Sequence, residues 1–456
     1  MTMQDRFGCE VTLADNQALV SWNNTLNGFL SHAGSTGKDL TDTIEQAPDF
    51  ALAHATKGLF FLLLGRRELY PSIHIALKTA KNSNHENPVS FRERQYISAL
   101  SAWLDGKPSQ AIHLMELVLE KYPHDPLAMK MSHAIRFMLG DSHGMRRSLE
   151  NLSHVYKGHE AEGYFLGCQS FALEETGEYE FAEKIGRKAL RLAPDDAWGL
   201  HAVTHVFDMT GRAKEGLSWI SGKEAAWEHC NNFRYHVWWH IALMQLDLGN
   251  YDKVLELYDE YIRKDKTDDY RDISNATSVL LRLEFEGIEV GDRWEELSAL
   301  AASRTQDNCV AFADLHYMMA LCNSAGTTDA TSLLANMAAS TEQRTTCEFS
   351  AVISNPGLLA AEGLEAFRDH DFARSANLLI NARPQLHTIG GSHAQRDIFD
   401  RLAIEASLRA GELTLASQLL TDRDAMRSAK DGYSLSRWAF IDDLRTNNDI
   451  ALQGAA

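Results

Sequence analysis

The stretch GEYEFAEKIGRKALRLAP, residues 177–194, decides the fold. It begins with Gly177, places Ala182 and Ala189 at helical spacing, and ends at Pro194. Small residues let two neighbouring helices approach closely, and proline cannot continue a helix because it lacks a backbone N–H. The pattern therefore predicts the second helix of a helical hairpin that turns at Gly177.

The same pattern returns along the chain. Gly106, Ala111 and Pro123 repeat its spacing, and Gly249 follows Trp238 by eleven residues and Ala242 by seven. The glycines that separate paired amphipathic runs are Gly65, Gly106, Gly140, Gly177, Gly211, Gly249, Gly287 and Gly326. Their separations are 41, 34, 37, 34, 38, 38 and 39 residues, which is the tetratricopeptide period with small insertions.

We therefore predict an all-α fold, a right-handed superhelical solenoid of tetratricopeptide-like helical hairpins with very little β-structure. Residues 1–50 are expected to form an N-terminal helical cap, residues 51–420 the repeat array, and residues 421–456 a C-terminal capping helix and tail. The last part of the array predicts hairpins over residues 363–383 and 397–420, with a loop from Pro384 to Ser392 between them.

Composition excludes several classes of function. The chain has 44 Lys and Arg against 63 Asp and Glu, a formal charge of −19, which repels polyphosphates, so we expect no nucleic-acid partner. Its longest apolar run, residues 59–64, is too short for a membrane span, and we expect no membrane contact. Six scattered cysteines and a charged first decapeptide favour a reduced, cytoplasmic protein.

Two adjacent hairpins each carry histidines four residues apart. His201 and His205 form one pair, and His236 and His240 form the other. Four residues make about one helical turn, so each pair shares a helix face. Paired helical histidines suit a metal such as Zn²⁺, although buried pairs of this kind also occur as purely structural groups.

Counting back from the glycines places these side chains along one inner surface. The first helix of a tetratricopeptide hairpin lines that surface, chiefly through its second, fifth, ninth and twelfth positions. Those positions fall on Trp198, His201, His205 and Asp208 before Gly211, on His236 before Gly249, and on His316 before Gly326. His240 lies one residue off this stripe. We expect Trp238 in the core and Trp239 on the inner surface, where it could stack on a ligand.

Other candidates lie outside the two histidine pairs. Asp314 and His316 could complete or orient the set. Residues 390–397 combine a glycine turn with His393, Arg396 and Asp397 in a first helical turn, where an anion could bind or where the residues simply cap a helix. Cys168 and Cys230 are weaker candidates for thiolate nucleophiles.

The chain resembles the tetratricopeptide repeat protein thirty-eight family from about Phe91 to Gly411. The landmarks are Arg92 to Tyr96, Trp103 to Pro108, Gly167 and Cys168, His201 to His205, Asn232 and Phe233, His236 to His240, Leu257 to Asp259, Gly291 to Trp294, Asp314 to Ala320, and Gly390 to Asp397. The resemblance implies a helical repeat fold and names no reaction.

Three functions follow from these patterns. The first is a histidine-rich concave pocket that binds a small molecule or peptide. The second is a Zn-dependent small-molecule hydrolase that uses the four paired histidines, with His316 as a further catalytic candidate. The third is a pure protein-interaction scaffold. Exposed faces at the ends of the array make a homodimer compatible with each of them.

Overall fold

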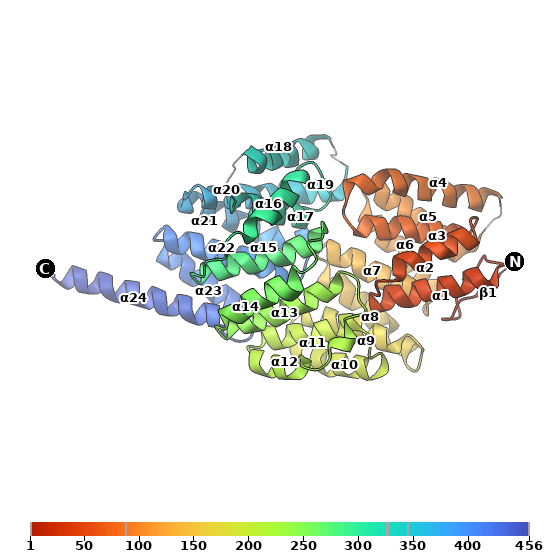
Figure 1. Cartoon of the computed structure of the whole chain (residues 1–456), viewed down its shortest axis with the longest axis horizontal. Coiled ribbons are helices and arrows are strands. Elements are labelled where there is room, and N and C mark those ends of the chain that lie inside the picture. Colours follow the sequence, from red (N-terminus) through yellow and green to blue (C-terminus); the bar gives the residue numbers. More distant parts are fainter. Residues whose placement is uncertain (1, 87–88, 325–327, 344–345, 455–456) are drawn as a thin grey trace.

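The computed structural model describes residues 2–86, 89–324, 328–343 and 346–454 as a chain of paired antiparallel helices (Figure 1). The N-terminal elements are β1 (Met3–Gln4), β2 (Glu10–Val11), α1 (Asn16–Ser31) and α2 (Thr36–Gln46). The strands form one short antiparallel hairpin. The fold is an all-α solenoid, as predicted.

Successive helical hairpins follow. They are α3 (Ala51–Leu63) with α4 (Tyr70–Glu86), α5 (Phe91–Leu104) with α6 (Pro108–Lys121), α7 (Pro126–Met138) with α8 (Ser142–Tyr156), α9 (Glu162–Glu174) with α10 (Tyr179–Leu192), α11 (Ala197–Met209) with α12 (Ala213–Ile220), α13 (Phe233–Asp247) with α14 (Tyr251–Leu257), α15 (Tyr270–Phe285) with α16 (Arg293–Ser303), and α17 (Ala311–Cys322) with α18 (Thr328–Gln343).

The C-terminal part contains α19 (Glu348–Val352), the hairpin α20 (Leu358–Arg368) with α21 (Phe372–Ala382), the hairpin α22 (His393–Arg409) with α23 (Leu413–Met426), and α24 (Gly432–Gly454). Short 3₁₀ segments cover Arg67–Leu69, Glu224–Ala226 and Arg383–Ile389, and π turns cover Tyr258–Ile262 and Ile353–Gly357. Figure 1 shows α24 extending from the body at the end opposite the N-terminus.

The glycines that defined the repeat also end its first helices. Gly65, Gly106, Gly140, Gly177, Gly211, Gly249 and Gly287 all have positive φ. A left-handed residue after the last helical turn is the usual C-terminal cap, and glycine adopts it without steric cost. The eighth glycine, Gly326, lies outside the described residues. The glycine register therefore located the turns of the hairpins correctly.

The solenoid curls until distant repeats meet. A methyl group at Gly140, between α7 and α8, would lie 1.9 Å from the carbonyl oxygen of His387, which precedes α22. At the N-terminal end, the Asn231 N–H donates to the carbonyl of His32 at 2.8 Å. As a result, α11, α15 and α17 are buried on nearly all sides. The surface expected to be a concave groove is therefore largely interior.

The C-terminal part of the array differs from the expectation in two places. The predicted loop from Pro384 to Ser392 was wrong over most of its length, because a 3₁₀ helix covers Arg383–Ile389 and only the glycine turn at residues 390–391 follows it. The division at residue 421 stays a prediction, although α23 runs through that residue and ends only at Met426. No described helix is long and apolar enough to cross a membrane.

Candidate metal centre and adjoining cavity

The four paired histidines converge in space. Nε2 of His201 lies 2.8 Å from Nε2 of His205 on its own helix, α11, and 3.1 Å from Nε2 of His236 on α13. Nε2 of His236 is in turn 3.1 Å from Nε2 of His240. One ring nitrogen from each of the four residues lies within 4.8 Å of all the others.

This spacing matches the donor atoms of a metal ion. With Zn–N bonds of about 2.1 Å, the edges of a tetrahedron of nitrogens are about 3.4 Å long. The three observed separations, 2.8, 3.1 and 3.1 Å, are about 0.3–0.6 Å shorter than this length. His240, although one residue off the ideal stripe, belongs to the group, because the histidine faces of α11 and α13 turn toward each other as the two hairpins stack.

Hydrogen bonds alone cannot account for these contacts. A neutral imidazole nitrogen either donates one hydrogen or accepts one with its lone pair. Nε2 of His201 has two short contacts, and so does Nε2 of His236. If His201 donates to His205 and His240 donates to His236, no hydrogen is left for the contact between His201 and His236. A cation that accepts four lone pairs satisfies all four nitrogens together.

Two of the outer ring nitrogens contact polar groups from neighbouring helices. Nδ1 of His236 lies 2.9 Å from Oδ1 of Asn275 on α15. Nδ1 of His205 lies 3.4 Å from Oε2 of Glu174, the last residue of α9. Acceptors behind a metal-bound histidine fix its tautomer and leave Nε2 free to coordinate. Neither acceptor could be found from the sequence, because each joins the group only through helix packing.

Burial keeps most of the group uncharged. It lowers the pKa of His201 and of His240 well below the usual value, and it lowers that of His236 to about 3. Burial acts on His205 in the same direction, but the neighbouring Glu174 carboxylate outweighs it and raises the pKa of His205. Neutral imidazole is the form that binds metals, so three of the four rings are ready to coordinate at neutral pH.

A second cluster adjoins the first. Carboxylate oxygens of Glu174 and Glu175 come within 4.8 Å of each other and of a ring nitrogen of His205. Glu175 also occupies the N-terminus of α22: its Oε1 accepts the His393 N–H at 2.8 Å, and its Oε2 lies 3.4 Å from Nη2 of Arg396. The anion site predicted at this helix end is thus filled by a carboxylate of the chain itself.

Other predicted residues lie outside the four-histidine group. His316 is buried, with Nδ1 2.7 Å from the carbonyl of Phe312 on its own helix. Asp314 is also buried, and burial raises its pKa well above the usual value. Neither residue belongs to a described group that could hold a metal. The expectation that they complete the histidine set is therefore not met.

The tryptophans show the opposite burial from the one expected. Trp239 is fully buried and stacks on His236 with ring centroids 5.2 Å apart. Trp238 is only partly buried, against Tyr261. Trp198 lies beside the group, with its ring centroid 5.0 Å from that of His201. Trp239 is buried because it packs against His236 and His240 on the inner side of the solenoid, which the closed repeats cover.

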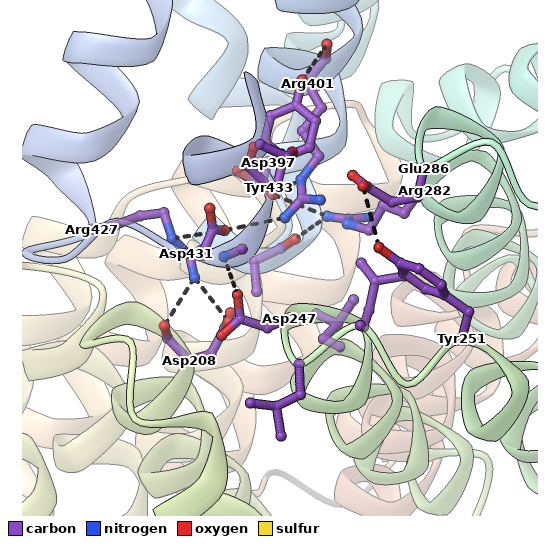
Figure 2. Close-up of a pocket in the computed structure, with 17 residues that line it drawn as sticks. Asp208, Asp247, Tyr251, Arg282, Glu286, Asp397, Arg401, Arg427, Asp431 and Tyr433 are labelled. Atoms are coloured by element: carbon purple, nitrogen blue, oxygen red, sulfur yellow. Dashed lines mark hydrogen bonds and ion pairs between the residues drawn. The ribbon is translucent and has the colours of Figure 1, made fainter. Parts of the chain in front are cut away.

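Figure 2 shows the side chains that line a cavity of about 270 Å³. On α11 and α13 its lining residues follow the histidines by about one helical turn. It is lined by Asp208 of α11, three residues after His205, and by Leu243 of α13, three residues after His240. The segment from α22 to α24 covers it with Asp397 and Asp431. Two predicted ligand-binding residues, Asp208 and Asp397, therefore line one cavity.

The cysteine candidates do not suit nucleophilic chemistry. Cys168 and Cys230 are both buried, and burial raises the pKa of each thiol to about 12. A thiol with such a pKa stays protonated at neutral pH, whereas the thiolate is the nucleophile.

Known proteins resemble this chain only distantly. No family model matches the sequence. Solved structures with some similarity include a tetratricopeptide repeat protein from Parabacteroides merdae (12% identity, 70% of this chain and 99% of that chain, TM-score 0.36). Yeast Tom70 is similar at 13% identity over 94% of this chain and 88% of its own, with a TM-score of 0.37. The human IFIT1 dimer with PPP-AAAA is similar at 13% identity over 97% and 98%, with a TM-score of 0.40. Likenesses this distant say nothing of function.

Proposed function

We propose that this chain is a helical-repeat metalloprotein that also binds a small molecule in the adjoining cavity. His201, His205, His236 and His240 bind one divalent transition-metal ion, with Zn²⁺ the first candidate. The observation that carries the proposal is the set of three Nε2 contacts, at 2.8, 3.1 and 3.1 Å, of which two can be hydrogen bonds while the contact between His201 and His236 is left without a hydrogen. Imidazole ligands suit Zn²⁺, Cu²⁺, Ni²⁺ and Fe²⁺.

A metal-dependent hydrolase is the second candidate. The cavity beside the histidines supports it, because a substrate held there would lie about one helical turn from the ion. Four protein ligands close a tetrahedral Zn²⁺ site, however, while catalytic zinc keeps one position for water. Hydrolysis at this centre therefore needs one histidine to leave the ion, or a five-coordinate ion.

A pure interaction scaffold is the third candidate. Such scaffolds bind peptides on the exposed inner helices of the solenoid. In this chain α11, α15 and α17 are buried on nearly all sides, which leaves little groove for a peptide. We therefore favour a small-molecule ligand over a peptide.

Three further expectations remain proposals. Membership of the tetratricopeptide repeat protein thirty-eight family is supported by the landmark residues given above. A location in the cytoplasm and the lack of a nucleic-acid partner are supported by the composition, with its formal charge of −19. The homodimer is supported by exposed Leu435 and Phe440 on α24.

Metal analysis tests the main proposal. Protein stripped with a chelator and titrated with Zn²⁺ or Co²⁺ should bind one ion per chain, and bound Co²⁺ should give visible absorption bands. His201→Ala and His240→Ala should each lose the ion. His113→Ala, which removes an exposed histidine, should keep it. A wild-type protein that binds none of Zn²⁺, Co²⁺, Ni²⁺, Cu²⁺ or Fe²⁺ would falsify the proposal.

A further inference from the structure

The cavity beside the histidines contains two arginines whose side-chain donors are only partly used. Nη2 of Arg282 donates to the carbonyl of Ala394 at 2.8 Å and Nη1 donates to the carbonyl of Ser278 at 3.1 Å, but its Nε has no hydrogen-bond partner among the described residues. In Arg401, Nε donates to Asp397 at 2.7 Å, while Nη1 has no such partner. Both arginines line the cavity.

These donors are buried. Arg282 is 1% exposed and Arg401 is 5% exposed. An unpaired buried donor destabilises the fold, and it does so more strongly when the group is charged. Burial, with Arg401 adding to it, lowers the pKa of Arg282 to about 9. The charge of Arg401 thus repels that of Arg282. An oxyanion of a bound molecule would accept from both unpaired donors and offset the repulsion between the two guanidinium groups.

The other charged residues restrict what that oxyanion can belong to. Of the residues that line the cavity, five are carboxylates and three are guanidinium groups, an excess of two negative charges. The carboxylates are Asp208, Asp247, Glu286, Asp397 and Asp431, and the guanidinium groups belong to Arg282, Arg401 and Arg427. A phosphate ester or another polyanion would meet net repulsion there. A molecule with one carboxylate and one positive group would not.

Asp247 is the carboxylate best placed for the positive group. It lies at the end of α13, and its Oδ1 accepts the Gly432 N–H at 2.5 Å. It forms no ion pair with any described residue, in contrast to Asp208, Asp397 and Asp431, which pair with arginines. Burial raises the pKa of Asp247, which a nearby ammonium group would oppose. Figure 2 shows Asp247 and Arg282 reaching the cavity from different helices.

Apolar side chains complete the lining. Leu243 and Leu246 of α13 and the rings of Tyr251 and Tyr433 contribute to the wall. They offer contact to a small aliphatic or aromatic body, since about 270 Å³ is slightly below the usual volumes of small-molecule sites.

We propose that this cavity binds a small amino carboxylate, a zwitterion with an apolar side chain. Its carboxylate accepts from Arg282 and Arg401, its ammonium group donates to Asp247, and its side chain packs on Leu243 and Leu246. The inference rests on the small-molecule part of the proposed function and is independent of the metal.

Three matched probes test the assignment by calorimetry. L-leucine carries both charges, 4-methylpentanoate lacks the ammonium group, and 3-methylbutylamine lacks the carboxylate. L-leucine should bind at least about tenfold more tightly than either analogue, a loss of about 1.4 kcal/mol for each missing group. Equal binding of the three probes, no binding of L-leucine at 10 mM (about −2.7 kcal/mol), or tighter binding of inorganic phosphate would overturn the proposal.

Substitutions in the cavity test the contacts to the ammonium group and to the carboxylate of the ligand separately. Asp247→Asn should weaken L-leucine by about tenfold and leave 4-methylpentanoate unchanged, because only the ammonium contact is lost. Asp252→Asn, an exposed change on the neighbouring helix, should alter neither. Arg401→Gln should weaken both carboxylates. A protein with Asp247→Asn that keeps full preference for L-leucine would contradict the assigned orientation.

The titrations are run on chelator-stripped protein and on Zn²⁺-loaded protein. Binding of L-leucine without any metal binding would support the cavity and reject the metal centre. Metal binding without binding of any probe would support the metal centre and reject the ligand proposed for the cavity. The two proposals can therefore fail separately.

Discussion

Nδ1 of His205 lies 3.4 Å from Oε2 of Glu174, and both side chains are completely shielded from solvent. Glu174 closes α9, so this contact brings a third helix to the histidine group formed by α11 and α13. A carboxylate behind a metal-bound imidazole orients the ring and raises its basicity. Glu174 is therefore a residue that positions His205 for the proposed metal, and it is not itself a proposed ligand.

Glu174→Gln should lower Zn²⁺ affinity by about 10–100-fold while all four histidines remain in place. The amide keeps the shape of the side chain and removes its charge. A competition titration with a coloured chelator measures the change. Glu180→Gln alters an exposed carboxylate on the neighbouring helix and should leave the affinity unchanged. Equal affinities in wild type and Glu174→Gln would show that His205 needs no carboxylate partner.

Arg423→Ala should destabilise the fold strongly. Arg423 is fully buried, and its guanidinium donates to Asp397 at 2.6 Å and to Asp431 at 2.6 Å. Its removal leaves two buried carboxylates short of a partner, which costs about 3–5 kcal/mol. Urea denaturation followed by circular dichroism measures the loss. Arg191→Ala, an exposed change, should alter the unfolding free energy by less than about 0.5 kcal/mol.

The same cluster predicts acid sensitivity. Burial raises the pKa of Asp431, but Arg423 and Arg427 outweigh it and hold that pKa well below the usual value. A carboxyl with a lowered folded pKa stabilises the protein above its unfolded pKa, about 3.9, and the contribution is lost as pH falls below that value. Wild type should lose stability steeply below about pH 4, and Arg423→Ala less steeply. Parallel stability curves for the two proteins would refute this explanation.

The repeat could be predicted from the sequence because each hairpin uses local rules. Gly177 and Gly211 end helices whatever the rest of the chain does, and the described glycines of the series have positive φ as those rules require. Counting back from Gly211 and Gly249 also predicted that His201 and His236 lie on the same inner surface. These features depend on contacts within a hairpin or between neighbours.

Features that depend on the curl of the solenoid could not be read in this way. Glu175 reaches α22 across 218 residues, and Arg427 reaches Asp208 across 219. Trp239 lies against the histidines on the inner side of the solenoid and is fully buried only because that side is closed over. No local sequence pattern shows where the superhelix closes. The cavity depends on that closure, because residues of α11 and α22 line it together.

Asp314 should make stability depend on pH in the opposite direction from Asp431. Burial raises its pKa well above the usual value, with Asp307 adding to the effect and the backbone of Asn308 opposing it. The native state then holds a proton that the unfolded chain loses above about pH 4, so stability falls as pH rises toward the folded pKa, by up to about 1.4 kcal/mol per pH unit.

Asp314→Asn removes that proton and should flatten the fall in unfolding free energy above about pH 4. Asp329→Asn, an exposed change on the following helix, should keep the wild-type slope. Unfolding free energies from urea titrations at several pH values make the comparison. An unchanged slope in Asp314→Asn would assign the pH dependence to another group.

The predicted homodimer is tested through α24. Leu435 is 57% exposed and Phe440 is 48% exposed on this helix, which extends from the body. If the helix pairs with a second copy, light scattering should give twice 51.0 kDa, and Leu435→Asp with Phe440→Asp should restore 51.0 kDa. Val20→Asp, at a residue 59% exposed on α1, serves as the matched control. A mass of 51.0 kDa at every concentration would exclude the dimer.

The closure of the solenoid is tested by substituting two glycines that share a left-handed backbone conformation. Gly140 and Gly177 both have positive φ, at 66° and 82°. A methyl group at Gly177 meets nothing within 4 Å, whereas one at Gly140 would lie 1.9 Å from the carbonyl oxygen of His387. Gly177→Ala should therefore cost only the strain of a left-handed alanine, about 1–2 kcal/mol.

Gly140→Ala should cost the same strain plus the displacement of the segment that leads into α22. That segment positions α22, whose Ala394, Asp397 and Arg401 line the cavity. Gly140→Ala should therefore also weaken L-leucine binding, which Gly177→Ala should leave intact. Urea denaturation gives the first comparison and calorimetry the second. Equal losses of stability in the two variants would mean that residues 140 and 387 do not touch in solution, and the cavity would then lack the closed wall on which ligand binding depends.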